Sequence, residues 1–165
     1  MPTPAAGSAR AGSGECPHGR PPLQWRRLGA GHTPGVAIQV TNGAALTCTF
    51  GAAPGTLTVL PRGALVQAGG TPAATVQDHA PTVNIGPFGL CTTPTNPQVA
   101  AATAAAMGTL TPQPCVPVTP VPWAPGSPTV LVDGQPALNS SSTCACQWGG
   151  VISIVAPGSA TTVLV

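Results

Sequence analysis

The chain has 165 residues, a length typical of one domain with a buried core, and its formal net charge is +2. Only 5% of the residues are charged, and aromatic residues make up 3%, so the core must consist mainly of Val, Ala, Leu and Ile. The sequence has no basic stripe interleaved with aromatics and no apolar run near the ~20 residues of a membrane span, which argues against nucleic acid as a partner and against a transmembrane helix.

Residues 1–35 differ in composition from the rest of the chain. They are rich in Gly, Pro and Ala, contain four of the five Arg residues, and show neither the 3.6-residue nor the 2-residue period of regular structure. We therefore expect residues 1–35 to form a flexible extension and residues 36–165 to form the folded domain. The N-terminus lacks the apolar core of a secretion signal, so we expect synthesis and assembly in the cytoplasm.

The folded part opens with β-hairpin signals. Apolar alternation on both sides of Asn42-Gly43 predicts a first hairpin, and the runs TLTVL and ALVQAG around residues 61–63 predict a second. Short strands are expected at Ala73–Val76 and Thr82–Ile85. Asp78 lies in the intervening turn, where we expect its side chain to bond the backbone; a metal-ligand role for His79 is the lesser alternative.

One helix is predicted. Asn96 is a suitable N-cap, Pro97 fits the first helical position, the run QVAAATAAAM has high helix propensity, and Gly108 fits the C′ position. The proline-rich segment that follows predicts a stiff, extended edge. Asp133-Gly134 predicts a hairpin between residues 129–132 and 135–138, and further strands are expected at Val151–Val155 and at the C-terminus.

A short phrase occurs three times in the chain. An Ala-Pro-Gly turn signal precedes a Thr-Val-Leu run at Ala53 to Leu60, at Ala124 to Leu131 and at Ala156 to Leu164. Three such copies predict three similar hairpin edges about a pseudo-threefold axis, which could pair with the strands of a threefold partner. The predicted docking residues are those of the three runs: Thr58, Val59, Leu60, Thr129, Val130, Leu131, Thr162, Val163 and Leu164.

The stretches GQPALN and CACQWGGVISI, which closes on APG, resemble the PAAR-like family, in a branch carried as a domain of unknown function. The resemblance extends upstream through LTCTFGAAPGTLTVL and ATVQDHAPTVNIGPFGLC to about Val36. It implies a mainly β, small conical fold of β-hairpins that caps and sharpens the spike of a type VI-like or extracellular contractile injection system. The implied partner is a trimeric VgrG/gp5-like spike protein, with one chain of this protein per trimer. The implied contact with the target membrane is transient.

Five cysteines lie in the predicted domain: Cys48, Cys91, Cys115, Cys144 and Cys146. Four of them could complete a tetrahedral structural zinc site if the three repeats converge. The resemblance also implies one metal near the point of the cone, although the His ligands of the well-known PAAR pattern are missing here. The alternative is that the thiols simply pack in the core, or that two of them form one disulfide.

Two other classes of function are alternatives to a spike tip. A toxin or enzyme would need titratable groups, yet the predicted domain has one His and two carboxylates, too few for acid/base or nucleophilic chemistry, so we expect no enzyme. An adaptor that attaches an effector to the spike, with residues 1–35 as its tether, remains the alternative.

Overall fold

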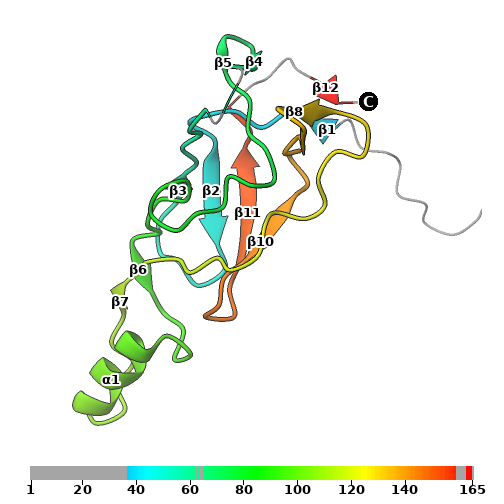
Figure 1. Cartoon of the computed structure of the whole chain (residues 1–165). Helices are drawn as coiled ribbons and strands as arrows, with labels where there is room; N and C mark the ends of the chain where they lie inside the picture. The colour runs from blue at the N-terminus through cyan, green and yellow to red at the C-terminus, as the bar shows by residue number, and fades with distance from the viewer. Residues whose placement is uncertain (1–36, 62, 64, 159–162, 165) are drawn as a thin grey trace, which may run out of the picture. The chain divides into compact units, whose positions relative to one another are not determined.

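The computed structural model describes residues 37–61, 63, 65–158 and 163–164. Its internal contacts divide the chain into two units, Met1–Thr33 and Pro34–Val165, and every described residue belongs to the second. The predicted extension at residues 1–35 lies outside the described residues. Among the described residues there are twelve short strands and one helix, and every ladder is antiparallel (Figure 1). The predicted mainly β fold with one short helix is confirmed.

The largest sheet has four strands in the order β10 (Thr143–Ala145), β11 (Val151–Ala156), β2 (Ala45–Cys48) and β3 (Gly55–Thr56). Alternate residues of these strands are buried, as the two-residue period of a strand requires: Leu46, Cys144 and Ile152 face the core. The predicted strand at Val151–Val155 is therefore confirmed. The same strands carry exposed residues such as Thr47 on the opposite face.

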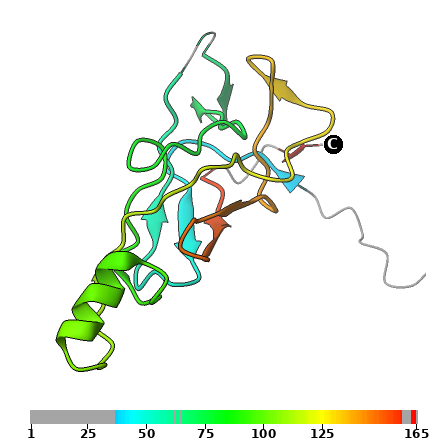
Figure 2. The same ribbon diagram turned by 60° about the horizontal axis from the view of Figure 1, so that its bottom comes forward.

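Four further ladders have only two residues per strand. They are β1 (Ala37–Ile38) with β12 (Val163–Leu164), β4 (Gln67–Ala68) with β5 (Thr71–Pro72), β6 (Leu90–Cys91) with β7 (Gln113–Pro114), and β8 (Leu131–Val132) with β9 (Gln135–Pro136). Figures 1 and 2 both place the ladders β4/β5 and β8/β9 far from helix α1.

Two of these ladders are closed by tight turns with left-handed backbone. Asp133 and Gly134 have φ of 49° and 75°, and Gly69 and Gly70 have φ of 61° and 84°. Positive φ at both central residues is the turn geometry that matches the twist of paired strands. The predicted Asp133-Gly134 hairpin is confirmed.

The predicted hairpin around residues 61–63 is wrong. Gln67 pairs with Pro72 across the Gly69-Gly70 turn, while Leu57 bridges Ile85. Two consecutive glycines accept positive φ at little cost, so they form the tighter turn and fix the register of the hairpin.

The hairpin predicted at Asn42-Gly43 is also wrong. Gly43 has φ of 84° and the Ala44 amide donates to the carbonyl of Thr41 at 3.2 Å, so a turn is present. However, Asn42 is not left-handed, and the strands on either side take different partners, β12 for β1 and β11 with β3 for β2. A turn with only its second central residue at positive φ does not impose hairpin pairing.

The strands predicted at Ala73–Val76 and Thr82–Ile85 are present only as isolated bridges. Thr82 has φ of 61°, and its amide donates to the carbonyl of Ile85 at 3.0 Å, so this stretch is a turn. The buried Asn84 side chain holds the turn, because it accepts from the Ala80 amide and donates to the carbonyl of Thr58.

Helix α1 (Pro97–Ala105) is the one helix of the described residues and confirms the prediction at its N-terminus. The Asn96 side chain accepts from the amide of Gln98 at 3.0 Å, and Pro97 takes the first helical position. At the C-terminus, Met107 rather than Gly108 follows the cap residue Ala106, with φ of 54°. The predicted C′ position of Gly108 is thus wrong by one residue. None of the helices among the described residues is long and apolar enough to cross a membrane.

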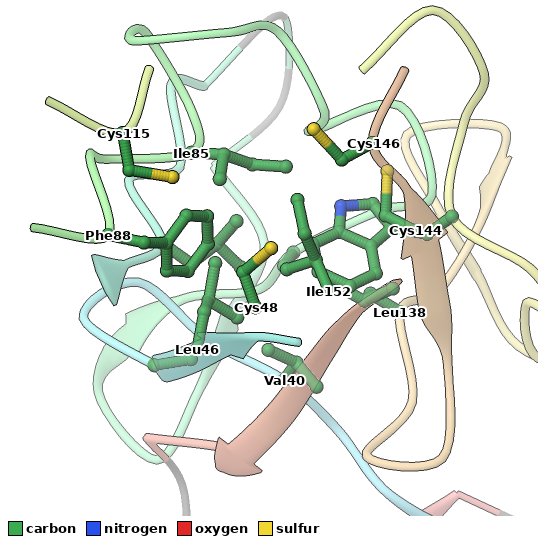
Figure 3. Packing of buried hydrophobic residues seen from close by; sticks show 14 of the residues in the cluster. Val40, Leu46, Cys48, Ile85, Phe88, Cys115, Leu138, Cys144, Cys146 and Ile152 are labelled. Atoms are coloured by element: carbon green, nitrogen blue, oxygen red, sulfur yellow. The ribbon is translucent and has the colours of Figure 1, made fainter. Parts of the chain in front are cut away.

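The main core lies against the four-stranded sheet. Its members are mostly aliphatic, with Phe88 and Trp123 as the buried aromatic side chains (Figure 3). Val40, Ala74 and Leu138, which are all fully buried, come from three separate parts of the chain. Their backbones form the site described next.

Candidate docking site

Three segments of the chain form a closed ring of backbone hydrogen bonds. We define the ring by residues 39–42, 73–76 and 137–140. The Val40 amide donates to the Leu138 carbonyl, the Leu138 amide to the Ala74 carbonyl and the Ala74 amide to the Val40 carbonyl, at 2.9, 2.9 and 2.8 Å. Each segment therefore donates to one neighbour and accepts from the other, which is the bonding pattern of a threefold axis.

A second set of three bonds runs around the ring in the opposite direction. Its donors and acceptors are equivalent in the three segments: Asn42 to Pro72, Val76 to Pro136 and Ser140 to Ile38, at 2.9, 3.1 and 2.9 Å. Three antiparallel bridges result, between Gln39 and Asn139, Thr41 and Ala73, and Thr75 and Ala137. These bonds satisfy half of the backbone amides of the ring, and others bond outside it, such as the Thr41 amide, which donates to the Pro157 carbonyl at 2.9 Å.

Each ring segment is preceded by a two-residue ladder. The strands β1, β5 and β9 lead directly into residues 39, 73 and 137. In two copies the ladder is extended by one more equivalent bond, from the Ala73 amide to the Val66 carbonyl and from the Ala137 amide to the Val130 carbonyl, both 2.9 Å. We call β1/β12, β4/β5 and β8/β9 the ring hairpins, although β1 and β12 come from distant parts of the chain and no turn joins them.

Each ring segment is also followed by a turn. The amides of Ala44, Asp78 and Ser142 donate to the carbonyls three residues earlier, at 3.2, 3.1 and 3.0 Å. In the second copy the Asp78 carboxylate accepts from the Thr75 amide and hydroxyl at 2.8 and 3.0 Å, which confirms its predicted role in a turn. The equivalent pair in the third copy is Ser142 and Asn139, joined by a hydroxyl bond at 3.0 Å.

The side chains beside the ring repeat the threefold pattern. Ala68, Val132 and Leu164 occupy the same position in the three ring hairpins, and all three are buried in a small cluster that is separate from the main core. Ala73 and Ala137, also equivalent, complete this cluster. The ring segments therefore lie between the two clusters, with Val40, Ala74 and Leu138 in the main core.

The predicted docking residues are only partly in this arrangement. Leu131 lies in β8, and Val163 and Leu164 lie in β12, so they belong to ring hairpins. Thr129 and Val130 precede β8, whereas Thr58, Val59 and Leu60 lie outside the strands. Thr162 lies outside the described residues.

The register of the ladders differs from that of the repeated phrase. Leu131 pairs with Pro136, and Val163 pairs with Ile38, so Leu131 and Val163 hold equivalent positions in their ladders. The repeated phrase instead aligns Leu131 with Leu164, one position further along the chain. Sequence reasoning missed a better signal, the match of GTPAAT at 70–75 with GQPALN at 134–139. Both stretches hold the second turn glycine, the strand and the ring segment.

The five cysteines are free thiols, and all are buried in the main core. In Figure 3 the sulfurs of Cys48, Cys115 and Cys146 point into the interior among Ile85, Phe88 and Ile152. Burial raises the pKa of Cys115 to about 12, with a further contribution from the neighbouring Cys91 thiol. Burial raises the pKa of Cys144 to about 11, and that of Cys48 is raised for the same reason.

Four of these five thiols are the predicted ligands of a structural zinc site. Among the described residues, no three His, Cys, Asp or Glu side chains lie close enough to hold one ion. A zinc site would hold its cysteines as thiolates. The structural zinc stays a prediction, which elemental analysis of the purified protein tests. The other candidate ligand, His79, places its Nδ1 3.1 Å from the carbonyl oxygen of Thr119.

Comparison with known proteins gives one match. Residues 40–159, which include almost all of the ring, match a family described as a domain of unknown function (DUF4280). No curated protein and no solved structure matches the chain. Because the match covers well over half of the sequence, the chain belongs to the DUF4280 family.

Proposed function

We propose that this protein is the PAAR-like tip of a contractile injection machine, in which one chain caps the end of a trimeric spike protein. The observation that carries the proposal is the ring, because a single chain that repeats one unit three times can meet three identical chains at once. Two-residue ladders leave strand edges on which a partner can add hydrogen bonds by β-augmentation. Such docking would also cover open edges on both proteins.

The charge distribution supports the same role. Within the described residues, the formally charged side chains are those of Asp78, which is buried, and Asp133. Desolvation of a surface with so little charge costs little free energy, which suits a protein that remains bound to a partner. We infer a structural role without catalysis, with assembly in the cytoplasm and departure on the spike when the particle fires.

The stoichiometry of the complex tests this proposal. The purified chain, mixed with a trimeric VgrG-like spike protein of the same source, should give one chain per three spike chains by native mass spectrometry. A complex with three chains per trimer, or no complex at all, would overturn the proposal.

A matched pair of insertions tests the docking face. Four Gly/Ser residues inserted between Asp133 and Gly134 should block binding, because they extend a ring hairpin. The same insertion after Gly108, beside α1, should leave binding unchanged (Figure 2). Equal binding by both variants would place the docking face elsewhere.

A further inference from the structure

A groove opens between the ring hairpins β4/β5 and β8/β9. Its volume is about 40 Å³, and its apolar lining includes Leu60, Pro61, Leu65, Val66, Ala73 and Val132. Ala73 and Val132 are buried and belong to the small cluster beside the ring, so the floor of the groove is continuous with that cluster. A space of this size exceeds what one water needs and admits the branched end of an aliphatic side chain.

The rim of the groove exposes more apolar surface than its floor. Leu60, Leu65 and Val66 are 50%, 58% and 41% exposed, although they are neighbours around one cavity. Large apolar side chains that cluster on a solvent-exposed surface indicate a contact with another protein. Among the described residues of the exposed rim, the charged side chain is that of Asp133, at the turn of β8/β9.

The groove breaks the threefold equivalence of the ring hairpins. Five of its lining residues, those at 59–61 and 65–66, belong to the connection between β3 and β4. The stretch before β8 is built differently, because Ser127 ties it to the ring through a bond from its amide to the Ala137 carbonyl at 2.8 Å. Three identical partner chains would therefore meet unequal surroundings on this face.

We propose that the groove receives one apolar side chain, of the size of Leu, Ile or Met, from the end of a single chain of the trimeric partner. The inference rests on the proposed capping function and adds how the partner is held: the ring hairpins match all three spike chains, while the groove anchors one. Such an anchor holds the cap in one orientation at a time, and the three orientations related by the symmetry of the spike remain equivalent. It also supplies a desolvated apolar contact, the kind that dominates protein-protein affinity.

Leucine substitutions with a matched control test the anchor. Leu60→Ser and Leu65→Ser should each weaken binding to the VgrG-like trimer about tenfold, since each removes a large share of an apolar contact. Leu110→Ser is the control, because Leu110 is also 50% exposed but follows α1. All three side chains are half-exposed or more, so the variants should keep the unfolding midpoint of the parent chain.

The outcomes separate the two proposals. Loss of affinity in the groove variants alone supports the anchor. Parental affinity in every variant, with one chain still bound per trimer, overturns the anchor and leaves the capping function in place. Failure of the parent chain to bind the trimer overturns the capping function, and the anchor with it.

A photoreactive residue at position 60 adds a second readout. It should cross-link to one spike chain per cap, which gives a product of one cap and one spike chain in a denaturing gel. Absence of that product, in a sample where the complex has formed, would contradict the anchor.

Discussion

Met107 is held in the left-handed conformation, which residues other than Gly, Asn and Asp rarely adopt. It follows the cap of α1 with φ of 54°, its amide donates to the Ala104 carbonyl at 3.1 Å, and the Gly108 amide donates to the Thr103 carbonyl at 2.9 Å. These two bonds form the Schellman motif, whose C′ position is usually glycine. The Met107 side chain is 98% exposed, so it contributes no packing that would offset this cost.

Met107→Gly should therefore stabilise the protein by about 1 kcal/mol, because a left-handed backbone costs a side-chain-bearing residue roughly that much. Urea denaturation measures the change. Ala104→Gly, inside the helix, is the control and should destabilise by about 0.5–1 kcal/mol. A loss of stability in Met107→Gly would show that the Met107 side chain has a packing role.

The buried thiols predict a loss of stability at alkaline pH. Burial raises the pKa of Cys115 to about 12 and that of Cys144 to about 11 in the folded state, above the ordinary value of 9.0. Above pH 9 the folded state holds protons that the unfolded state releases. The contribution of these two thiols to the free energy of unfolding is therefore complete below pH 9 and falls as pH rises toward their folded-state pKa values. Each of these thiols lowers the free energy of unfolding by about 1.4 kcal/mol per pH unit in this window.

Urea titrations at pH 8, 9, 10 and 11 measure this slope. The sequence has no Lys and no Tyr, so no other side-chain type titrates across the window. Cys144→Ala should reduce the slope at pH 9–11 whatever it does to stability at pH 8. A stability independent of pH over this range would mean that the thiols are ionised or metal-bound in the folded protein.

Among the elements, the two closed ring hairpins offer a test of structural equivalence. Gly70 and Gly134 occupy the same turn position, with φ of 84° and 75°, and an added Cβ would meet no neighbouring atom at either. Substitution by Ala thus reports backbone strain alone.

Gly70→Ala and Gly134→Ala should each cost about 1–2 kcal/mol in free energy of unfolding, by similar amounts. The double variant should lose the sum of the two. Gly86→Ala is a control with ordinary backbone, where only van der Waals contact with Thr56 is expected. A large difference between the two hairpin variants would argue against their equivalence.

The elements that the sequence predicts correctly are those specified by neighbouring residues. Asn96 and Pro97 start α1 through local bonds, and Asp133-Gly134 closes β8/β9 through its own backbone preference. The errors arise where pairing depends on distant residues. Nothing near Asn42 shows that β1 pairs with β12, and nothing near Leu57 shows that it bridges Ile85.

At the scale of the whole molecule, Leu138 joins the ring to the main core. Its backbone takes part in the cycle with Val40 and Ala74, and its side chain is fully buried. Leu138→Ala should cost about 2–5 kcal/mol, because it leaves a cavity where the three segments meet. Leu131→Ala is the control, since Leu131 is 62% exposed, and thermal unfolding compares the two. Similar melting temperatures for both variants would show that Leu138 is not central to the fold.

The threefold character of the molecule was predictable, but its members were not. The repeated Ala-Pro-Gly phrase points to three copies, yet residues 58–60 lie outside the ring hairpins and the third copy is shifted in register. Backbone hydrogen bonds, which carry no residue signature, define the ring. The copies also keep little side-chain identity, as Val40, Ala74 and Leu138 show.

The pairing of β1 with β12 has a consequence for how the protein is made. Two hairpins of the set are local and can form while the polypeptide is still leaving the ribosome, but Ala37 must wait for Leu164. A chain that ends before Val163 would therefore form two ring hairpins and leave β1 without its partner strand. Synthesis through Leu164 is therefore required before all three ring hairpins can form.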